Sequence, residues 1–213
     1  MGIKASDGQF VVIGQKGTGS VAIEAALTLL GLPYRLEEIR HAQFHEHNPM
    51  VQVPVLVTPQ GERITESAAI LIWLAEAHPQ ARLAPAAGDP RRAQFLRWMA
   101  FVASSIYAHY WVRDDPSRVA ADNAAQAEVK AALNARIADN WGVMEAGLTP
   151  KTYLLGDEIT VLDLYVAVVS RWTPRKALHE TIAPRIGEVV RRVEADPRLA
   201  DLFAERFPLR ADG

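Results

Sequence analysis

A glycine-rich stretch near the start of the chain has the residue types and spacing of an anion-binding loop. An apolar run over residues 10–14 leads through Gly17 and Gly19 into a stretch with apolar residues at helical spacing, residues 19–30. The first turn of a helix offers unpaired N–H groups and the positive end of the helix dipole, both of which attract anions. A phosphate, a dinucleotide and a thiolate are each chemically reasonable ligands for such a loop.

Two of these ligands can be compared with known sequence motifs. A phosphate-binding P-loop places a lysine directly after its last glycine, whereas Lys16 precedes both glycines here. The dinucleotide motif G-x-G-x-x-[GA] is matched by Gly17, Gly19 and Ala22, and Glu37 lies where a ribose-binding acid would be expected. That fold requires further parallel strand–helix units, which the rest of the sequence does not predict. The dinucleotide is therefore a minor alternative.

The elements that would position the loop fall into two groups. Alternating or β-branched runs predict strands at residues 9–14, 34–39, 53–58 and 63–66. Helical spacing of apolar residues predicts helices at residues 19–30, 67–78, 91–113, 119–147 and 160–172, and one or two more within 181–206. A segment rich in proline, glycine and alanine separates the last strand-containing part from the remaining helices. We predict an α/β domain at residues 1–80, a linker at 81–90 and an all-α domain at 91–213.

The composition limits the classes of partner. The chain has 213 residues, a net charge of -2 and no cysteine, so neither nucleic-acid binding nor chemistry by a protein thiol is expected. The longest apolar run, residues 68–75, is too short to cross a membrane, and no secretory signal is visible, so we expect a cytoplasmic protein. His41, His45 and His47 match no defined zinc motif, so we expect a solvated loop there and no metal.

Two residue pairs further along the chain favour a thiolate as the ligand of the glycine-rich loop. Val53-Pro54 places a proline at the start of a predicted strand, where it removes no hydrogen bond from the middle of a sheet. Glu66-Ser67 lies where a strand is followed by a helix, so the N–H groups and dipole of that helix can attract a carboxylate. In the C-terminal part, Thr160 and Asp163 have the spacing of a helix capping box.

These features together resemble the glutathione S-transferase family. The segments that carry the resemblance are "NPMVQVPVL", "ITESAAILIWL" and "GDEITVLDLYVA". The resemblance implies an α/β thioredoxin-like N-terminal domain followed by an all-α helical-bundle C-terminal domain. It also implies a homodimer that uses glutathione as cosubstrate, without a metal, to detoxify a small hydrophobic electrophile or to reduce a peroxide.

The resemblance assigns glutathione-binding roles to five residues. The bond before Pro54 would be cis, and the backbone of Val53 would pair with the cysteinyl part of glutathione. Ser67 would bind the γ-glutamyl carboxylate and Glu66 the ammonium group. Gln52 matches a position that helps to hold the peptide backbone of the ligand.

The catalytic position departs from the family pattern. Members of the family place a tyrosine, serine or cysteine before the first helix, but the serine and cysteine positions fall here on Gly17 and Gly19. The nearby hydroxyls are those of Thr18 and Ser20, which makes the chain similar to the serine- and threonine-dependent classes. We favour Ser20 because it directly precedes the helical run; a plain helix N-cap is its alternative role. The glycines also leave open a non-catalytic binding or assembly protein with the same fold.

The acceptor substrate would bind against the helical domain. Tyr107, Tyr110 and Trp111, near the end of the predicted helix 91–113, are the candidates to line its site. An aromatic stripe at helical spacing usually packs in a core, and we expect this of Phe95 and Trp98.

Overall fold

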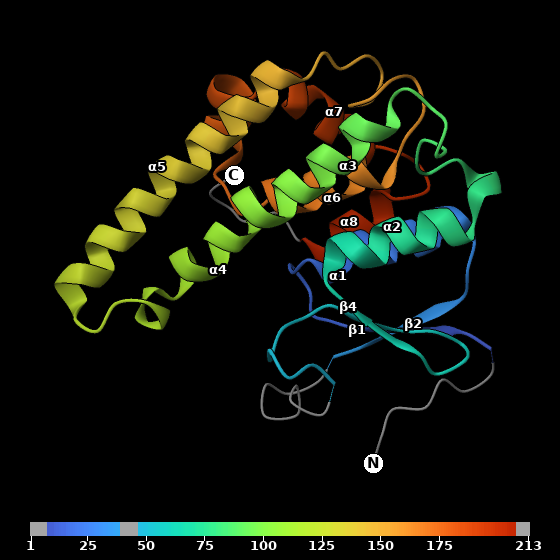
Figure 1. Cartoon of the computed structure of the whole chain (residues 1–213), viewed down its shortest axis with the longest axis horizontal. Coiled ribbons are helices and arrows are strands. Elements are labelled where there is room, and N and C mark those ends of the chain that lie inside the picture. Colours follow the sequence, from blue (N-terminus) through green and yellow to red (C-terminus); the bar gives the residue numbers. More distant parts are fainter. Residues whose placement is uncertain (1–7, 39–46, 208–213) are drawn as a thin grey trace.

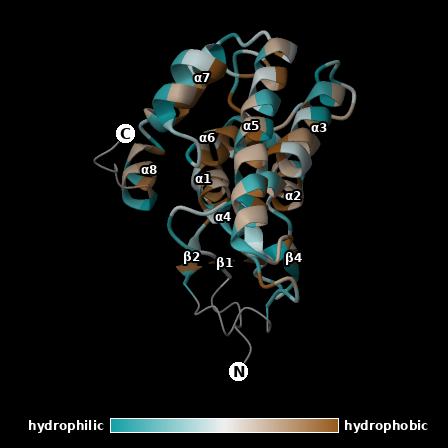
Figure 2. Cartoon of the chain, turned by 90° about the vertical axis from the view of Figure 1, so that its left-hand side faces the viewer, coloured by the Kyte–Doolittle hydropathy of each residue, from teal (hydrophilic) through white to brown (hydrophobic). Residues whose placement is uncertain are grey.

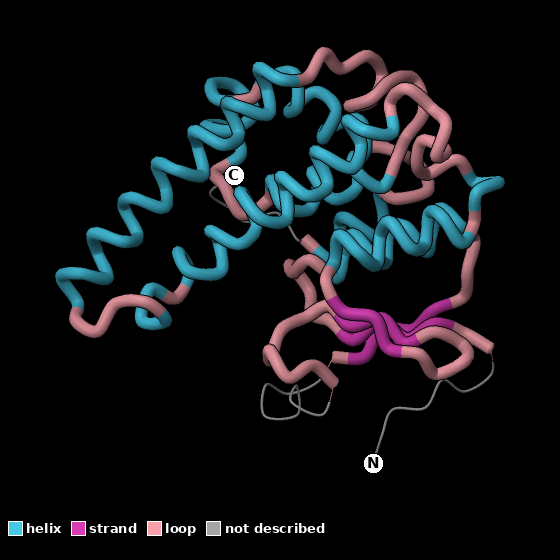
Figure 3. Tube along the Cα trace, in the orientation of Figure 1, coloured by secondary structure: helices cyan, strands magenta, loops and turns pink. Residues whose placement is uncertain are grey.

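A four-stranded sheet covered by two helices forms the N-terminal part of the molecule (Figures 1 and 3). The computed structural model describes residues 8–38 and 47–207. The strands and helices of this part are β1 (Phe10–Ile13), α1 (Ser20–Leu30), β2 (Tyr34–Glu37), β3 (Val55–Val57), β4 (Arg63–Thr65) and α2 (Ser67–Ala77). The strand order is β2-β1-β3-β4, with β1 parallel to β2 and antiparallel to β3.

The two faces of β1 contribute to two separate apolar clusters. Phe10 and Val12 join the main core together with Leu56 of β3, and this is the face on which α1 and α2 pack. Val11 and Ile13 point to the opposite face, where they form a smaller buried cluster with valines of β3. The alternation follows from the two-residue period of a strand, and it fixes the register in which Val12 is opposite Leu56.

Helices make up the C-terminal part. They are α3 (Arg92–Phe101), α4 (Ala108–Asp114), α5 (Asn123–Gly147), α6 (Val161–Ser170), α7 (Pro184–Glu194) and α8 (Ala200–Arg206). Every residue of α6 is buried, as its continuous apolar sequence requires, and Figure 2 shows it brown in the middle of the molecule. The long helix α5 and α4 extend side by side away from the sheet (Figure 1).

The predicted capping box at the start of α6 is present. The Asp163 carboxylate accepts hydrogen bonds from the N–H of Thr160 at 2.8 Å and, through its other oxygen, from the N–H of Leu154 at 2.8 Å. The Thr160 hydroxyl also donates to it at 2.7 Å. Burial raises the pKa of Asp163 to about 6, because removal from water disfavours the charged form more than these hydrogen bonds favour it.

The architecture confirms the predicted fold class. In the described part of the chain the strands end at Thr65, and only an isolated bridge between Tyr153 and Gly156 follows. The described sheet has one parallel strand pair, so the doubly wound dinucleotide fold is excluded. The single helix predicted at residues 91–113 is interrupted in the structure, because a π-helical segment, Val102–Tyr107, separates α3 from α4. No helix in the described residues is long and apolar enough to cross a membrane.

Candidate functional site

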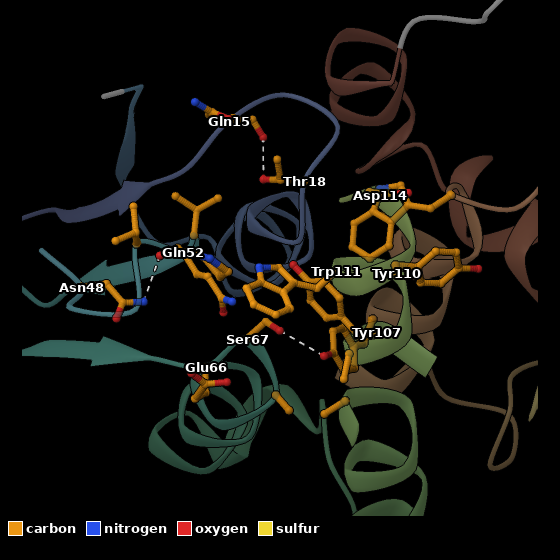
Figure 4. Close-up of a pocket in the computed structure, with 18 of the residues that line it drawn as sticks. Gln15, Thr18, Asn48, Gln52, Glu66, Ser67, Tyr107, Tyr110, Trp111 and Asp114 are labelled. Carbon is orange, nitrogen blue, oxygen red and sulfur yellow. Dashed lines mark hydrogen bonds between the residues drawn. The ribbon is translucent and has the colours of Figure 1, made fainter. Parts of the chain in front are cut away.

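A cavity of about 740 Å³ lies where the loops at one end of the sheet meet the helical part (Figure 4). Its walls on the sheet side include Thr18, Val53 and Ser67, and its walls on the helical side include Tyr107 and Trp111. The structure therefore brings most of the predicted site residues together around one space. The exception is Ser20, which does not line the cavity.

The glycine loop is held in place by a residue from the helical part. Gly17 has a φ of 74°, in the left-handed region that favours glycine. Its carbonyl oxygen accepts a hydrogen bond of 2.8 Å from Nε1 of Trp172, which follows α6. Gly19 is the N-cap residue of α1 and makes no side-chain cap. The N–H groups of Ser20 and Val21 bond instead to Oγ1 and the carbonyl oxygen of Thr18, at 3.4 and 3.2 Å, so the helix start acts near the cavity mainly through its dipole.

The two candidate hydroxyls of this loop differ in position. Thr18 lines the cavity, and its Oγ1 donates to the carbonyl oxygen of Gln15 at 2.8 Å. Ser20 is fully buried in the first turn of α1, so it is not the N-cap. Its Oγ donates to the same carbonyl at 3.1 Å and accepts from the Gln15 N–H at 3.3 Å. The geometry thus favours Thr18 over Ser20 as a residue that can reach a ligand.

The segment before β3 forms the floor of the site. The Val53-Pro54 peptide bond is cis, which confirms the predicted geometry of this bond. The buried Asn48 organises the approach to it, because its Nδ2 donates to the Gln52 carbonyl at 2.9 Å while its Oδ1 accepts the N–H of Met50 at 3.0 Å. Asn48 is not among the site residues predicted from the sequence, where its one signal is an Asn-Pro pair ahead of the strand.

The Glu66-Ser67 pair lies at the start of α2, as predicted. Glu66 is exposed and has a φ of 65°, an unusual backbone conformation for a residue with a side chain. The hydroxyl of Ser67 donates to the hydroxyl of Tyr165 in α6 at 3.0 Å. Figure 4 marks this bond by the dashed line that starts at Ser67. Both residues line the cavity, so this helix N-terminus also opens onto it.

Aromatic residues form the helical wall. Tyr107 and Trp111 line the cavity, and Trp111 is 40% exposed with the Arg118 guanidinium 4.1 Å above its ring. Tyr110 also contributes to the wall, but its hydroxyl bonds the Thr173 hydroxyl and accepts from Nε1 of Trp141 at 3.2 Å. Its polar end is therefore used within the helical core.

Burial raises the pKa values of two tyrosines at the site. Burial raises the pKa of Tyr107 to about 12, although a hydrogen bond with the Gly19 backbone acts in the opposite direction. Burial also raises the pKa of Tyr165. Both hydroxyls are therefore protonated at neutral pH and can serve as hydrogen-bond donors.

The described residues contain no group of three histidine, cysteine or acidic side chains that could hold a metal ion. Of the three histidines for which we predicted a solvated loop, His41 and His45 lie outside the described residues. His47 is only 8% exposed, so that prediction is wrong for this residue.

Two family models match the chain. The N-terminal domain of glutathione S-transferases matches residues 20–77, and the C-terminal domain of the same family matches residues 116–206. The chain belongs to the glutathione S-transferase family. The first range contains α1, the cis bond and the start of α2, and the second contains α6 with its capping box.

Relatives of this glutathione S-transferase family member match over most of their length. It is 28% identical to the GST-like protein YncG of Escherichia coli, over 90% of this chain and 96% of that protein. It is 25% identical to the glutathione S-transferase GST-4.5 of Xanthomonas campestris, over 92% and 96% of the two chains.

Solved structures share the fold. A glutathione transferase homologue from Sulfitobacter, crystallised with bound glutathione, has a TM-score of 0.84 at 24% identity, covering 93% of this chain and 99% of the other. A sphingomonad glutathione S-transferase complexed with glutathione has a TM-score of 0.78 at 23% identity, covering 93% and 100%.

Proposed function

We propose that the protein is a glutathione transferase, which binds glutathione and stabilises its thiolate for attack on an electrophilic small molecule or for peroxide reduction. The observation that carries the proposal is the convergence of three backbone features on one cavity. These are the glycine loop at Gly17 and Thr18 that leads into α1, the N-terminus of α2 and the strand entry at Val53. Glutathione has a thiol, two carboxylates and a peptide backbone, and the three features offer complementary groups to them.

Each part of glutathione has a complementary group in this arrangement. The γ-glutamyl carboxylate would bind at the start of α2, where Ser67 lines the cavity, and the exposed Glu66 would pair with the ammonium group. The cysteinyl backbone would pair with the backbone of Val53, next to Gln52. This placement directs the thiol toward the first turn of α1.

The reaction would use glutathione itself as the nucleophile. Free thiols have a pKa of about 8.5, and a positive helix end together with hydrogen-bond donors lowers it. The thiolate would then form a carbon–sulfur bond to the electrophile while the leaving group departs. Of the two hydroxyls predicted to act, Thr18 has the better position and Ser20 the weaker one.

The acceptor would bind on the helical side of the cavity. Tyr107, Trp111 and the ring of Tyr110 provide an apolar wall there. Such a wall favours a small hydrophobic electrophile.

Calorimetric titration with glutathione tests the proposal. We expect saturable heat, which should weaken about tenfold or more in Ser67→Ala, because the γ-glutamyl carboxylate loses a donor at the helix end. Tyr34→Phe, on β2 away from the cavity, is the matched control and should bind like the natural protein. Absence of saturation at millimolar glutathione would sink the proposal.

A non-catalytic binding or assembly protein is the second candidate. It is favoured by the hydroxyls of Thr18 and Ser20, which both lie within hydrogen-bond distance of the Gln15 carbonyl oxygen. Saturable glutathione binding without transfer to an aryl halide, an epoxide or an organic peroxide would support it.

We also propose a homodimer, which is expected for this family. Sedimentation equilibrium should give twice the 23.4 kDa mass of one chain. A single-chain mass at micromolar concentration would contradict this expectation. The predicted domain boundaries and the cytoplasmic location stay predictions.

A further inference from the structure

Position 19 has no room for a side chain, because Tyr107 from the helical part of the molecule packs against it. Its φ is -60° and its ψ is -15°, a conformation that any residue can adopt, so the backbone does not require glycine. A Cβ atom added at Gly19 would lie 2.5 Å from the hydroxyl oxygen of Tyr107 and 3.1 Å from two of its ring carbons. The space of a side chain at position 19 is therefore occupied by the Tyr107 hydroxyl.

Several contacts hold Tyr107 in this place. It is the last residue of the π-helical segment Val102–Tyr107, and such segments often occur at functional sites. Its ring packs on Trp172 with a centroid distance of 4.7 Å and edge-on against Tyr165 at 6.2 Å. Because Trp172 also binds the Gly17 carbonyl, the ring and the glycine loop are positioned by the same residue.

We propose that Tyr107 supplies the hydroxyl that donates a hydrogen bond to the thiolate of bound glutathione, in place of a residue of the glycine loop. The inference rests on the proposed function and names a catalytic residue for it. The hydroxyl lies beside Gly19 at the start of α1, and Tyr107 lines the cavity together with Thr18 and Ser67. Figure 4 shows Tyr107 among the labelled residues of the cavity.

The hydrogen-bonding geometry leaves the Tyr107 proton free for this role. The Gly19 backbone bonds to the phenol oxygen, and no acceptor for the hydroxyl hydrogen is found among the residues that the structure describes. Thr18 and Ser20, in contrast, both have the Gln15 carbonyl oxygen as an acceptor. Unlike Thr18 and Ser20, Tyr107 therefore has no competing acceptor among the described residues.

The proton balance is simple. The thiol loses its proton to solvent, and the phenol keeps its own, because the pKa of Tyr107 is raised to about 12 and a thiol titrates near 8.5. Glu66 is a charged group that acts on the Tyr107 hydroxyl, and its negative charge also favours the protonated phenol. Tyr107 forms no covalent bond in the reaction.

Tyr107→Phe tests the proposal with a spectroscopic readout. The ultraviolet absorption of the thiolate is followed against pH in the complex with glutathione. We expect the pKa of the bound thiol to rise by about one unit or more and kcat/KM at pH 6.5 to fall roughly 10- to 100-fold. Tyr34→Phe, which removes a phenol hydroxyl outside the cavity, should leave both quantities unchanged.

A second variant distinguishes the effect of the Tyr107 hydroxyl from a general effect on the fold. Gly19→Ala displaces the Tyr107 hydroxyl, so it should raise the thiol pKa in the natural background but add little to Tyr107→Phe. If the natural protein binds glutathione and the thiol pKa in Tyr107→Phe is unchanged, the role of Tyr107 is refuted while the proposed function stands. If the natural protein does not bind glutathione, the proposed function fails first and the role of Tyr107 fails with it.

Discussion

At the scale of single residues, the hydroxyl of Ser20 serves the glycine loop itself. It bonds both the N–H and the carbonyl of Gln15, and a Cβ atom at Gly14 would lie 2.3 Å from the Cβ of Ser20. Gly14 is therefore small because Ser20 packs on it. This pairing fixes the loop that leads from β1 into α1.

Ser20→Ala should accordingly lower stability more than it alters chemistry. Removal of a buried hydroxyl with two backbone partners is expected to cost about 1–3 kcal/mol in the free energy of unfolding. Urea denaturation gives this value, and the thiol pKa of bound glutathione gives the chemical effect. An unchanged stability with a raised thiol pKa would return Ser20 to the catalytic role.

His179 predicts a pH dependence of stability. It is 5% exposed, and burial, together with the nearby Arg175, Arg191 and Arg171, lowers its pKa to about 4. The unfolded chain therefore binds a proton at this position between about pH 6.5 and 4 that the folded chain does not. Its contribution to stability is complete above pH 6.5 and is lost as the pH falls toward 4.

His179→Leu should remove this loss. Urea midpoints measured from pH 7.5 to 4.5 are expected to fall less steeply in the variant than in the natural protein. Asp163, whose pKa is raised, makes stability change with pH in the opposite direction. It does so in both proteins, so the difference between their urea midpoints is unaffected. Parallel curves would show that His179 is protonated in the folded chain.

At the scale of elements, the start of α6 depends on one carboxylate. Asp163 accepts hydrogen bonds from two backbone N–H groups and one hydroxyl, all of them buried. α6 carries Tyr165 to the cavity and is followed by Trp172, so its position determines the back of the site.

Asp163→Ala should destabilise the protein by about 2–5 kcal/mol, because it leaves two buried N–H groups without an acceptor. Asp157→Ala is the matched control, since Asp157 is an exposed carboxylate near the same helix start. It should change stability by less than about 0.5 kcal/mol. Equal effects of the two substitutions on the urea midpoint would contradict the role of the capping box.

At the scale of the whole molecule, side chains join the sheet-containing part to the helices around the site. Trp172 binds Gly17, Ser67 binds Tyr165, and Arg206 of α8 pairs with the buried Glu24 of α1 at 2.9 Å. These contacts set the distance between the two walls of the cavity.

Trp172→Phe should loosen the glycine loop without unfolding the chain. The ring packing on Tyr107 is largely kept, but the hydrogen bond to the Gly17 carbonyl is lost. We expect faster amide hydrogen exchange at residues 15–20 and a several-fold weaker affinity for glutathione. Trp73→Phe, in α2 and outside the cavity, is the control. Unchanged exchange in this loop would show that Trp172 does not hold it.

The strands, most helices and the capping box of α6 could be predicted from the sequence, because they depend on neighbours close along the chain. Apolar periodicity places β1 and α1, and the spacing of Thr160 and Asp163 specifies a helix start. The motifs around Pro54 and Glu66 likewise lie in continuous segments, which is why the family could be identified from them.

Only the tertiary structure decided which side chains meet. The spacing of residues 91–113 predicts a helix but not the π-helical segment that ends at Tyr107. No local pattern connects Tyr107 or Trp172 with Gly19 and Gly17, because these contacts join segments about 90 and 155 positions apart. The sequence by itself determined that position 19 lacks a side chain. That Tyr107 fills this space depends on how the helical part packs against the sheet-containing part.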